Sequence, residues 1–296
     1  MVADTRQGTA AKLHIAIGTY AETGVLRSGA VRSDLVELEF ADIKPINRAF
    51  APMVREARFD VSEMAIATFL QAKAYDIPLV LLPIVLAARF QETALLCRAD
   101  KPLGPGELSG CRIGVRAYSQ TTGMWLRGIL GEFYGIVPQR VKWITFEDAH
   151  VPFYRDPPWA ERAPVGRDML DMLRAGDLDA VIVGNDPPND PELRLVFDAK
   201  AAQEIFWRRH HFVPINHMVT IRRDLAESRP DLVHALYRMF LRARAKNPQS
   251  VDYPLPPWTR SGLREPLDLA LRYSQDLLPR AIGAEDIWEG LPEGIG

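Results

Sequence analysis

Short apolar runs rich in Val, Ile and Leu alternate along the chain with segments in which apolar residues recur at helical spacing. The apolar runs predict β-strands at 13–18, 35–40, 79–85, 93–97, 112–116, 141–145, 180–183 and 213–221. The helical spacing predicts helices at 47–57, 63–75, 123–134, 166–175, 199–210, 230–246 and 263–277. Because strands and helices alternate, the sequence predicts an α/β fold.

A Pro- and Gly-rich connector at 98–110, RADKPLGPGELSG, is the clearest predicted boundary in this pattern. A second connection is expected near 213–220, where VPINHMVT would return the chain to the first unit. The expected division is therefore a discontinuous lobe of residues 1–104 plus 214–296, with residues 105–213 inserted as a second lobe. Two α/β lobes joined by two crossings would form a hinged cleft, a usual place for a small ligand.

The composition is that of an ordinary globular protein. The chain has 296 residues, 47% of them hydrophobic and 25% charged, which is enough to bury a core. Its formal net charge of -2 gives no electrostatic footprint for nucleic acid or an acidic membrane surface, so neither partner is expected. Cys97 and Cys111 are too few for a disulfide scaffold or a cysteine-based zinc site.

Motifs and terminal segments narrow the function classes further. No Walker loop, GxGxxG, HExxH, GxSxG or EF-hand pattern occurs, which argues against phosphoryl transfer, dinucleotide binding, zinc proteolysis and serine hydrolysis. Residues 1–20 lack the basic start, apolar core and cleavage site of a signal peptide. The longest apolar run, 77–88, contains prolines and is too short to span a bilayer. We therefore expect a cytoplasmic protein, and a homo-oligomer is left open.

The stretch RAYSQTTGMWL at 116–126 lies between a predicted strand and a predicted helix. Ser119, Thr121 or Thr122 would lie at or near the helix N-cap, where a side-chain oxygen accepts from free backbone N–H groups. The same geometry turns several N–H groups outward at the positive end of the helix dipole, which favours a carboxylate or phosphate. With Arg116 just before it, the stretch fits either an ordinary helix cap or an anion site.

A second polar cluster, TFEDAHV, contains Glu147, Asp148 and His150. These residues follow a predicted strand, and ligand sites in α/β proteins gather on loops at strand ends. His150 with an acidic partner fits general acid–base catalysis. Two alternatives stay open: a divalent metal site, although no strong ligand spacing is present, and a solvated acidic loop closed by prolines.

Two further groups of polar residues are candidates. His217 lies beside Asn216 in an otherwise apolar strand, either as a structural histidine or facing the cleft at the predicted crossing. Arg58 precedes Ser62 and Glu63, which are predicted to start the helix at 63–75. That helix start would be either a plain cap or a second N-terminus able to hold an anion.

Four blocks of the sequence together resemble the 4,5-dihydroxyphthalate decarboxylase family. They are NRAFAPMVREARFDVSEMAIATFLQAKAYDIPLVLLPIVLAARFQ, GVRAYSQTTGMWLRGIL, TFEDAHV and PINHMVTI, within a similarity that runs from about the first strand to Arg244. That family is similar in fold to type II periplasmic solute-binding proteins. The resemblance therefore implies a two-lobed fold of that kind, with a ligand cleft between lobes joined by two crossings.

The resemblance also implies an activity: decarboxylation of 4,5-dihydroxyphthalate, or a similar hydroxylated aromatic dicarboxylate, to a protocatechuate-type product and CO2 in phthalate degradation. It implies a small aromatic carboxylate as the partner. We predict no cofactor, with a divalent metal as the alternative. The matched positions are Arg58, Ser62, Glu63, Arg116, Ser119, Gln120, Thr121, Thr122, Glu147, Asp148, His150, Asn216 and His217.

We expect His150 and His217 to be acid and base, in either order, with Glu147 or Asp148 orienting one of them. The remaining matched positions are expected to bind the substrate, with the stretch at 116–122 holding a carboxylate. The alternative function is a solute-binding protein that captures an aromatic or carboxylate ligand without turning it over.

Overall fold

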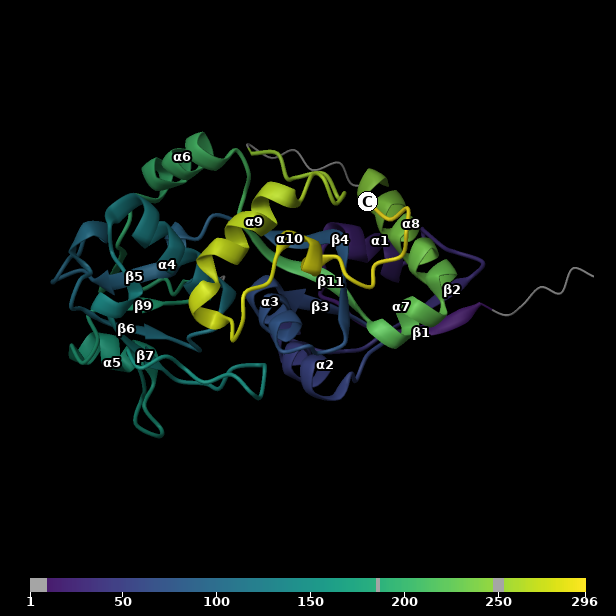
Figure 1. The fold of residues 1–296 in the computed structure, drawn as a ribbon. Coiled ribbons are helices and arrows are strands. Elements are labelled where there is room, and N and C mark those ends of the chain that lie inside the picture. The colour runs from purple at the N-terminus through teal and green to yellow at the C-terminus, as the bar shows by residue number, and fades with distance from the viewer. Residues whose placement is uncertain (1–9, 185–186, 247–252) are drawn as a thin grey trace, which may run out of the picture.

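The computed structural model describes residues 10–184, 187–246 and 253–296, and Figure 1 shows them folded into two α/β units side by side. We call the unit built on the first sheet lobe 1 and the unit built on the second sheet lobe 2. The first sheet has the strand order β2-β1-β3-β11-β4. Its strands are β1 (Ala11–Ala16), β2 (Val36–Phe40), β3 (Val61–Ala65), β4 (Leu79–Ala88) and β11 (Ile215–Arg222).

The first sheet is mixed: β1 pairs in parallel with β2 and β3, whereas β11 runs antiparallel to β3 and β4. All five residues of β3 are buried, because helices cover both faces of the central strands. The helices of lobe 1 are α1 (Ala21–Arg27), η1 (Ile46–Ala49), α2 (Phe50–Glu56), α3 (Ile66–Ala74), α7 (Arg223–Ser228), α8 (Pro230–Lys246) and α10 (Ala284–Ile287).

The second sheet has the order β10-β5-β9-β6-β7-β8. Its strands are β5 (Leu95–Arg98), β6 (Arg112–Val115), β7 (Lys142–Thr145), β8 (Ala160–Arg162), β9 (Ala180–Ile182) and β10 (Leu193–Leu195). Strands β6 to β9 pair in parallel, and β5 and β10 are antiparallel. Its helices are η3 (Pro105–Glu107), α4 (Thr121–Tyr134), η4 (Pro138–Arg140), α5 (Met169–Ala175) and α6 (Ala199–His210).

The chain crosses between the lobes at two adjacent segments. The first crossing, 89–94, joins β4 to β5 through η2 (Glu92–Ala94), and the second, 211–214, leads into β11. A backbone hydrogen bond from Arg89 N to Pro214 O, 3.0 Å long, ties the two crossings together. Since β5 pairs within the second sheet, sheet membership changes before the connector at 98–110 rather than within it.

A C-terminal segment contacts both lobes. Helix α9 (Arg264–Tyr273) and η5 (Gln275–Leu277) lie across the junction in Figure 1. The Tyr273 ring packs edge-on against Trp125 of α4, with centroids 5.7 Å apart, and the Gln71 amide of α3 donates to Leu277 O at 3.2 Å. This segment, expected in lobe 1, therefore bridges the two lobes.

The two-lobed α/β fold is confirmed, with one error at a functionally important place. The segment predicted as a helix at 63–75 is split into β3 and α3, so Ser62 and Glu63 lie in a central strand rather than at a helix start. The prediction that they form an anion-binding helix N-terminus is therefore wrong. The short elements α1, β8 and β10 were also not predicted.

Among the described residues, none of the helices is both long enough and apolar enough to cross a membrane.

Candidate active site between the lobes

A cavity of about 350 Å³ lies between the two lobes, and its size is that of a small-ligand site. Lobe 1 contributes side chains from η1, α2, the β3–α3 junction and β11, and lobe 2 contributes the start of α4 and two loops. The lining residues are Pro45, Ile46, Asn47, Phe50, Ala65, Thr68, Asn216 and His217 from lobe 1, and Arg116, Gln120, Thr121, Thr122, His150 and Gly184 from lobe 2.

The lobe 2 wall is the N-terminus of α4. Gln120 is the N-cap residue, in extended backbone conformation, and its side chain makes no capping bond within the described chain. The first helical hydrogen bond runs from Met124 N to Gln120 O at 2.9 Å, so the N–H groups of residues 121–123 have no intrahelical acceptor. These donors and the helix dipole favour an anion at this wall.

The two threonine hydroxyls at this wall accept hydrogen bonds from lobe 1 and from the first crossing. Thr121 Oγ1 accepts from Ala67 N at 3.2 Å, and Thr122 Oγ1 accepts from the Arg89 guanidinium at 3.0 Å. A hydroxyl that accepts one hydrogen bond keeps its own O–H as a donor. Both threonines are thus positioned to donate to a carboxylate, and neither serves as the predicted helix cap.

Arg116 completes the positive end of the cavity. Its guanidinium lines the cavity and pairs with Glu147 at 2.7 Å. Because the Glu147 side chain is half exposed, this pair is screened by water and can exchange for a ligand carboxylate at small cost.

His217 is held by a carboxylate buried in lobe 1. Its Nδ1 lies 2.6 Å from Glu63 Oε1, and the Glu63 side chain has no solvent exposure. The same Oε1 accepts from the Tyr20 hydroxyl at 2.6 Å, and Oε2 accepts from Gly18 N at 2.9 Å. Since the ionised carboxylate is only an acceptor, His217 Nδ1 must donate, which leaves Nε2 for a ligand in the cavity.

Tyr20 reinforces this arrangement as a donor. Burial, followed by the nearby Glu63 charge and the hydrogen bond between them, raises the pKa of the Tyr20 hydroxyl far above its usual value. Tyr20 therefore stays protonated throughout the physiological pH range, and its O–H donates a hydrogen bond to Glu63.

His150 is held by a hydroxyl of the opposite lobe. Its Nδ1 lies 2.9 Å from Thr68 Oγ1. Burial, together with the positive charges of Arg116 and Arg55 and the neighbouring His217, lowers the pKa of His150 to about 4. The imidazole of His150 is therefore neutral at neutral pH.

The Phe50 ring lies beside both histidines. It packs edge-on against His150 with centroids 5.6 Å apart and against His217 with centroids 5.1 Å apart. Phe50 is itself buried, so it fixes the spacing of the two imidazoles and adds an apolar surface on which an aromatic ring can rest.

Asn216 is oriented by a second amide. Gln91 Nε2 donates to Asn216 Oδ1 at 2.9 Å, and Asn216 Nδ2 donates back to Gln91 Oε1 at 3.3 Å. Because Gln91 belongs to the first crossing and Asn216 follows the second, this pair fixes the cavity wall where the lobes join. It leaves one Asn216 N–H for a ligand.

Several residues predicted for the site lie outside the cavity lining. Ser62 is fully buried and donates to Glu63 O at 2.8 Å. Arg58 is exposed and pairs with Glu56. Ser119 is buried but is not among the lining residues, and Glu63 reaches the cavity only through His217.

The acidic residues beside His150 do not orient either histidine. Glu147 pairs with Arg116, and the Asp148 side chain, 90% exposed, pairs with Arg162 at 3.2 Å. Thr68 and Glu63 take the predicted orienting positions instead. Within the described ranges, no group of three or more His, Cys, Asp or Glu side chains is placed to hold a metal ion.

Phe50 and Thr68 were not found from the sequence. Phe50 lies at an apolar position of a predicted helix, which is typical of a core residue, and Thr68 lies in an apolar segment with no motif around it. Their importance depends on contacts with residues about 80 to 170 positions away, which a local pattern does not contain.

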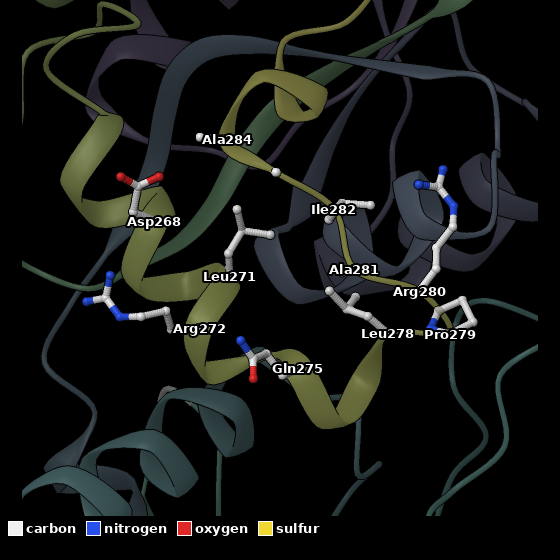
Figure 2. A pocket seen from close by; sticks show the side chains of 11 residues that line it. Asp268, Leu271, Arg272, Gln275, Leu278, Pro279, Arg280, Ala281, Ile282 and Ala284 are labelled. Atoms are coloured by element: carbon white, nitrogen blue, oxygen red, sulfur yellow. The ribbon is translucent and has the colours of Figure 1, made fainter.

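A larger groove of about 650 Å³ lies on the C-terminal segment, and Figure 2 shows its side chains. Leu271, Leu278 and Ile282 lie between Arg272 on one side and Arg280 on the other. One stretch of chain, residues 268–284, forms the whole groove, and no histidine lines it. Its size alone does not indicate chemistry, so we take the smaller cavity between the lobes as the candidate active site.

The fold and this cavity define a class: two-lobed α/β proteins that enclose a small ligand between their lobes. The chain is similar in fold to the periplasmic aliphatic sulphonate binding protein of Escherichia coli, with a TM-score of 0.57, 14% identity, and coverage of 95% of this chain and 98% of that one. At this identity the likeness concerns the fold alone.

Sequence relatives place the chain within that class. It is 30% identical over 255 residues to a 4,5-dihydroxyphthalate decarboxylase of Comamonas testosteroni, covering 79% of this chain and 75% of the relative. It is 29% identical over 180 residues to the enzyme of the same name from Pseudomonas putida, covering 57% of this chain and 69% of that relative. No family model matches the chain. The chain belongs to the 4,5-dihydroxyphthalate decarboxylase family.

Proposed function

We propose that this chain is a carboxy-lyase that converts 4,5-dihydroxyphthalate, or a similar hydroxylated aromatic dicarboxylate, to a protocatechuate-type product and CO2. The observation that carries the proposal is that one cavity joins two histidines from different lobes with the donor-rich N-terminus of α4. The names of the two relatives support the same activity.

The reaction requires a base, an acid and an anchor. In 4,5-dihydroxyphthalate a hydroxyl lies para to each carboxylate, so removing its proton directs electron density to the carbon that bears the carboxylate. That carbon must then be protonated before CO2 leaves. His150 and His217 supply the proton-transfer groups, and Arg116, Thr121 and Thr122 bind the carboxylate that remains.

Water exclusion is the second contribution of the cavity. Lobe 1 and lobe 2 meet over the site through hydrogen bonds such as Thr121 to Ala67 and Arg55 to the backbone of the His150 loop. A closed cavity strengthens the charge interactions that stabilise the dearomatised intermediate. Lobe closure around the substrate therefore belongs to the proposal.

A cytoplasmic location belongs to the same proposal. Cys97 and Cys111 are both free thiols, as is usual in a reducing compartment. Cell fractionation with an antibody against the native protein tests it.

The activity is tested by incubating the purified protein with 4,5-dihydroxyphthalate and measuring released CO2 and protocatechuate by chromatography. Phthalate, which lacks the hydroxyls, is the matched control: it should bind at the α4 wall and release no CO2. Binding of both compounds without product would replace the proposal with a solute-binding function. If neither binding nor product is observed, the substrate is a different aromatic acid.

A further inference from the structure

Glu63 is the most deeply buried charged group that contacts the site. Its side chain is fully buried, and it accepts hydrogen bonds from Gly18 N, the Tyr20 hydroxyl and His217 Nδ1. Three hydrogen-bond donors are the surroundings that favour an ionised carboxylate. A buried ionised carboxylate is costly unless a positive charge compensates for it, and the basic side chain that contacts Glu63 is His217.

We propose that Glu63 is a positioning residue that keeps His217 as the imidazolium, so that His217 is the acid that protonates the ring carbon and His150 is the base that takes the hydroxyl proton. This assignment rests on the proposed decarboxylation. It decides which histidine has which role, and it replaces the expectation that Glu63 binds the substrate.

The surroundings of His150 fit the role of base. Arg116 lines the same cavity, Arg55 donates to the His150 carbonyl, and both guanidiniums oppose a second positive charge there. Thr68 contacts Nδ1, so the other ring nitrogen is left for the substrate hydroxyl. A neutral imidazole has a free lone pair that can accept the hydroxyl proton, but it has no proton acidic enough to give to carbon.

The two protonation states also support each other. Two imidazoliums on either side of Phe50 would repel, and the charge of His217 is one of the influences that keep His150 neutral. Tyr20 also contacts Glu63 of this pair, and it stays protonated. The proposal therefore combines a neutral His150 with a charged His217 in one cavity.

The chemical steps balance with these roles. His150 accepts the hydroxyl proton, and the oxygen electron pair moves through the ring to form a C–H bond with the proton given by His217. The bond between that carbon and its carboxylate then breaks, its electron pair restores the aromatic ring, and CO2 leaves. His150 returns its proton to the phenolate oxygen, and His217 regains a proton from solvent. One proton is consumed for each CO2 released.

The test is nuclear magnetic resonance of imidazole-labelled protein at pH 7, with the His217 signals assigned from a His217→Asn variant. Both ring nitrogens of His217 should carry protons in the wild-type protein, whereas His150 should carry one. This readout requires neither turnover nor a Glu63 variant. A single proton on His217 in the wild-type protein would overturn the proposal.

Glu63→Gln extends the test because glutamine keeps the size of the side chain and removes its charge. The variant should leave one ring proton on His217 and lower kcat about 10²-fold, the usual contribution of a general acid, with the Kd for phthalate unchanged. Glu92→Gln is the matched control, since Glu92 is also fully buried but does not line the cavity. It should leave the His217 signals and kcat as in the wild-type protein.

Tyr20→Phe separates charge from packing. The variant removes one donor to Glu63 but leaves its negative charge, so His217 should keep both protons and kcat should fall less than about tenfold. Equal losses of kcat in Tyr20→Phe and Glu63→Gln, with His217 unchanged in both, would reduce Glu63 to a structural role. If 4,5-dihydroxyphthalate releases no CO2, the proposed function fails, and the His217 signals still decide the role of Glu63.

Discussion

The two histidines of the candidate site are held in different ways. His217 contacts Glu63, and Glu63 accepts from the Tyr20 hydroxyl and Gly18 N, all of which belong to lobe 1. His150 belongs to lobe 2, but its partners Thr68 and Arg55 come from lobe 1. Each histidine with its partners forms one half of the site. The His217 half is therefore complete within one lobe, whereas the His150 half is complete only when the lobes meet. With the proposed roles, the acid is therefore in place within lobe 1, and the base is in place only after closure.

The largest expected effect comes from removing each histidine in turn. His150→Ala and His217→Ala should each lower kcat by about 10²–10⁴-fold, since each removes one proton-transfer group. The two variants should differ at high pH, where the substrate hydroxyl ionises without a base. Raising the pH from 7 toward 9 should partly restore His150→Ala for as long as His217 keeps its proton, and should leave His217→Ala inactive. Rates of CO2 release across this pH range measure the difference, and the opposite pattern would exchange the two roles.

Thr68→Val breaks the contact on which the His150 half depends. The substitution keeps the shape of the side chain and removes the hydroxyl 2.9 Å from His150 Nδ1. We expect kcat to fall about tenfold, the worth of one well-placed hydrogen bond. Ser274→Ala, which removes another buried hydroxyl that does not line the cavity, should leave kcat unchanged. A wild-type rate in Thr68→Val would mean that His150 needs no partner from lobe 1.

The different construction of the two halves also explains what the sequence could predict. The polar stretch at 116–122 is predictable because a polar run between a strand and a helix is a local pattern. His150 and His217 stood out as polar residues at the end of a strand and within one, and both line the cavity. The sequence predicts that Glu147 or Asp148, which are close to His150 in the chain, orients one of them. The actual partners, Thr68 and Glu63, lie 82 and 154 positions away.

The error at β3 has a related physical cause. A strand buried on both faces lacks the apolar–polar alternation of an exposed strand, so VSEMA and the following helix read as one helical segment. Glu63 was therefore placed at a helix start, where acidic residues are common. A charged residue in a fully buried strand needs a partner that sequence position does not reveal, and here that partner is His217 from β11, the strand next to β3.

Arg55→Gln should loosen the His150 half by a smaller amount. Arg55 donates to Ala149 O at 2.8 Å and His150 O at 2.9 Å across the junction, and its charge helps to lower the pKa of His150. Removing that charge raises the pKa of His150, so the base becomes protonated at a higher pH and the acid limb of kcat/KM moves upward from about pH 4. KM should rise severalfold because closure loses two hydrogen bonds.

The matched control for Arg55 is Arg32→Gln, which removes an exposed guanidinium that also donates to a backbone carbonyl, Gly29 O. It should leave KM and the acid limb of the pH profile as in the wild-type protein. A shift of the acid limb in both variants would point to general surface charge rather than to the Arg55 contact.

Glu92→Gln has the smallest expected effect, because it touches the first crossing and neither histidine. Glu92 is fully buried, and burial raises its pKa from 4.5 to about 7 although the backbone N–H groups of Gln91 and Glu92 oppose this shift. The folded protein therefore binds this proton more tightly than the unfolded chain. The corresponding stability is complete below pH 4.5 and is lost as the pH rises through about 7.

Glutamine cannot ionise, so the Glu92→Gln variant should gain about 1–2 kcal/mol in the free energy of unfolding at pH 8 and little at pH 4. Urea unfolding at the two pH values measures this, and an equal gain at both would assign the effect to packing. Together with an unchanged kcat, a gain confined to high pH would show that a buried carboxyl is costly without a partner, whereas Glu63 has one in His217.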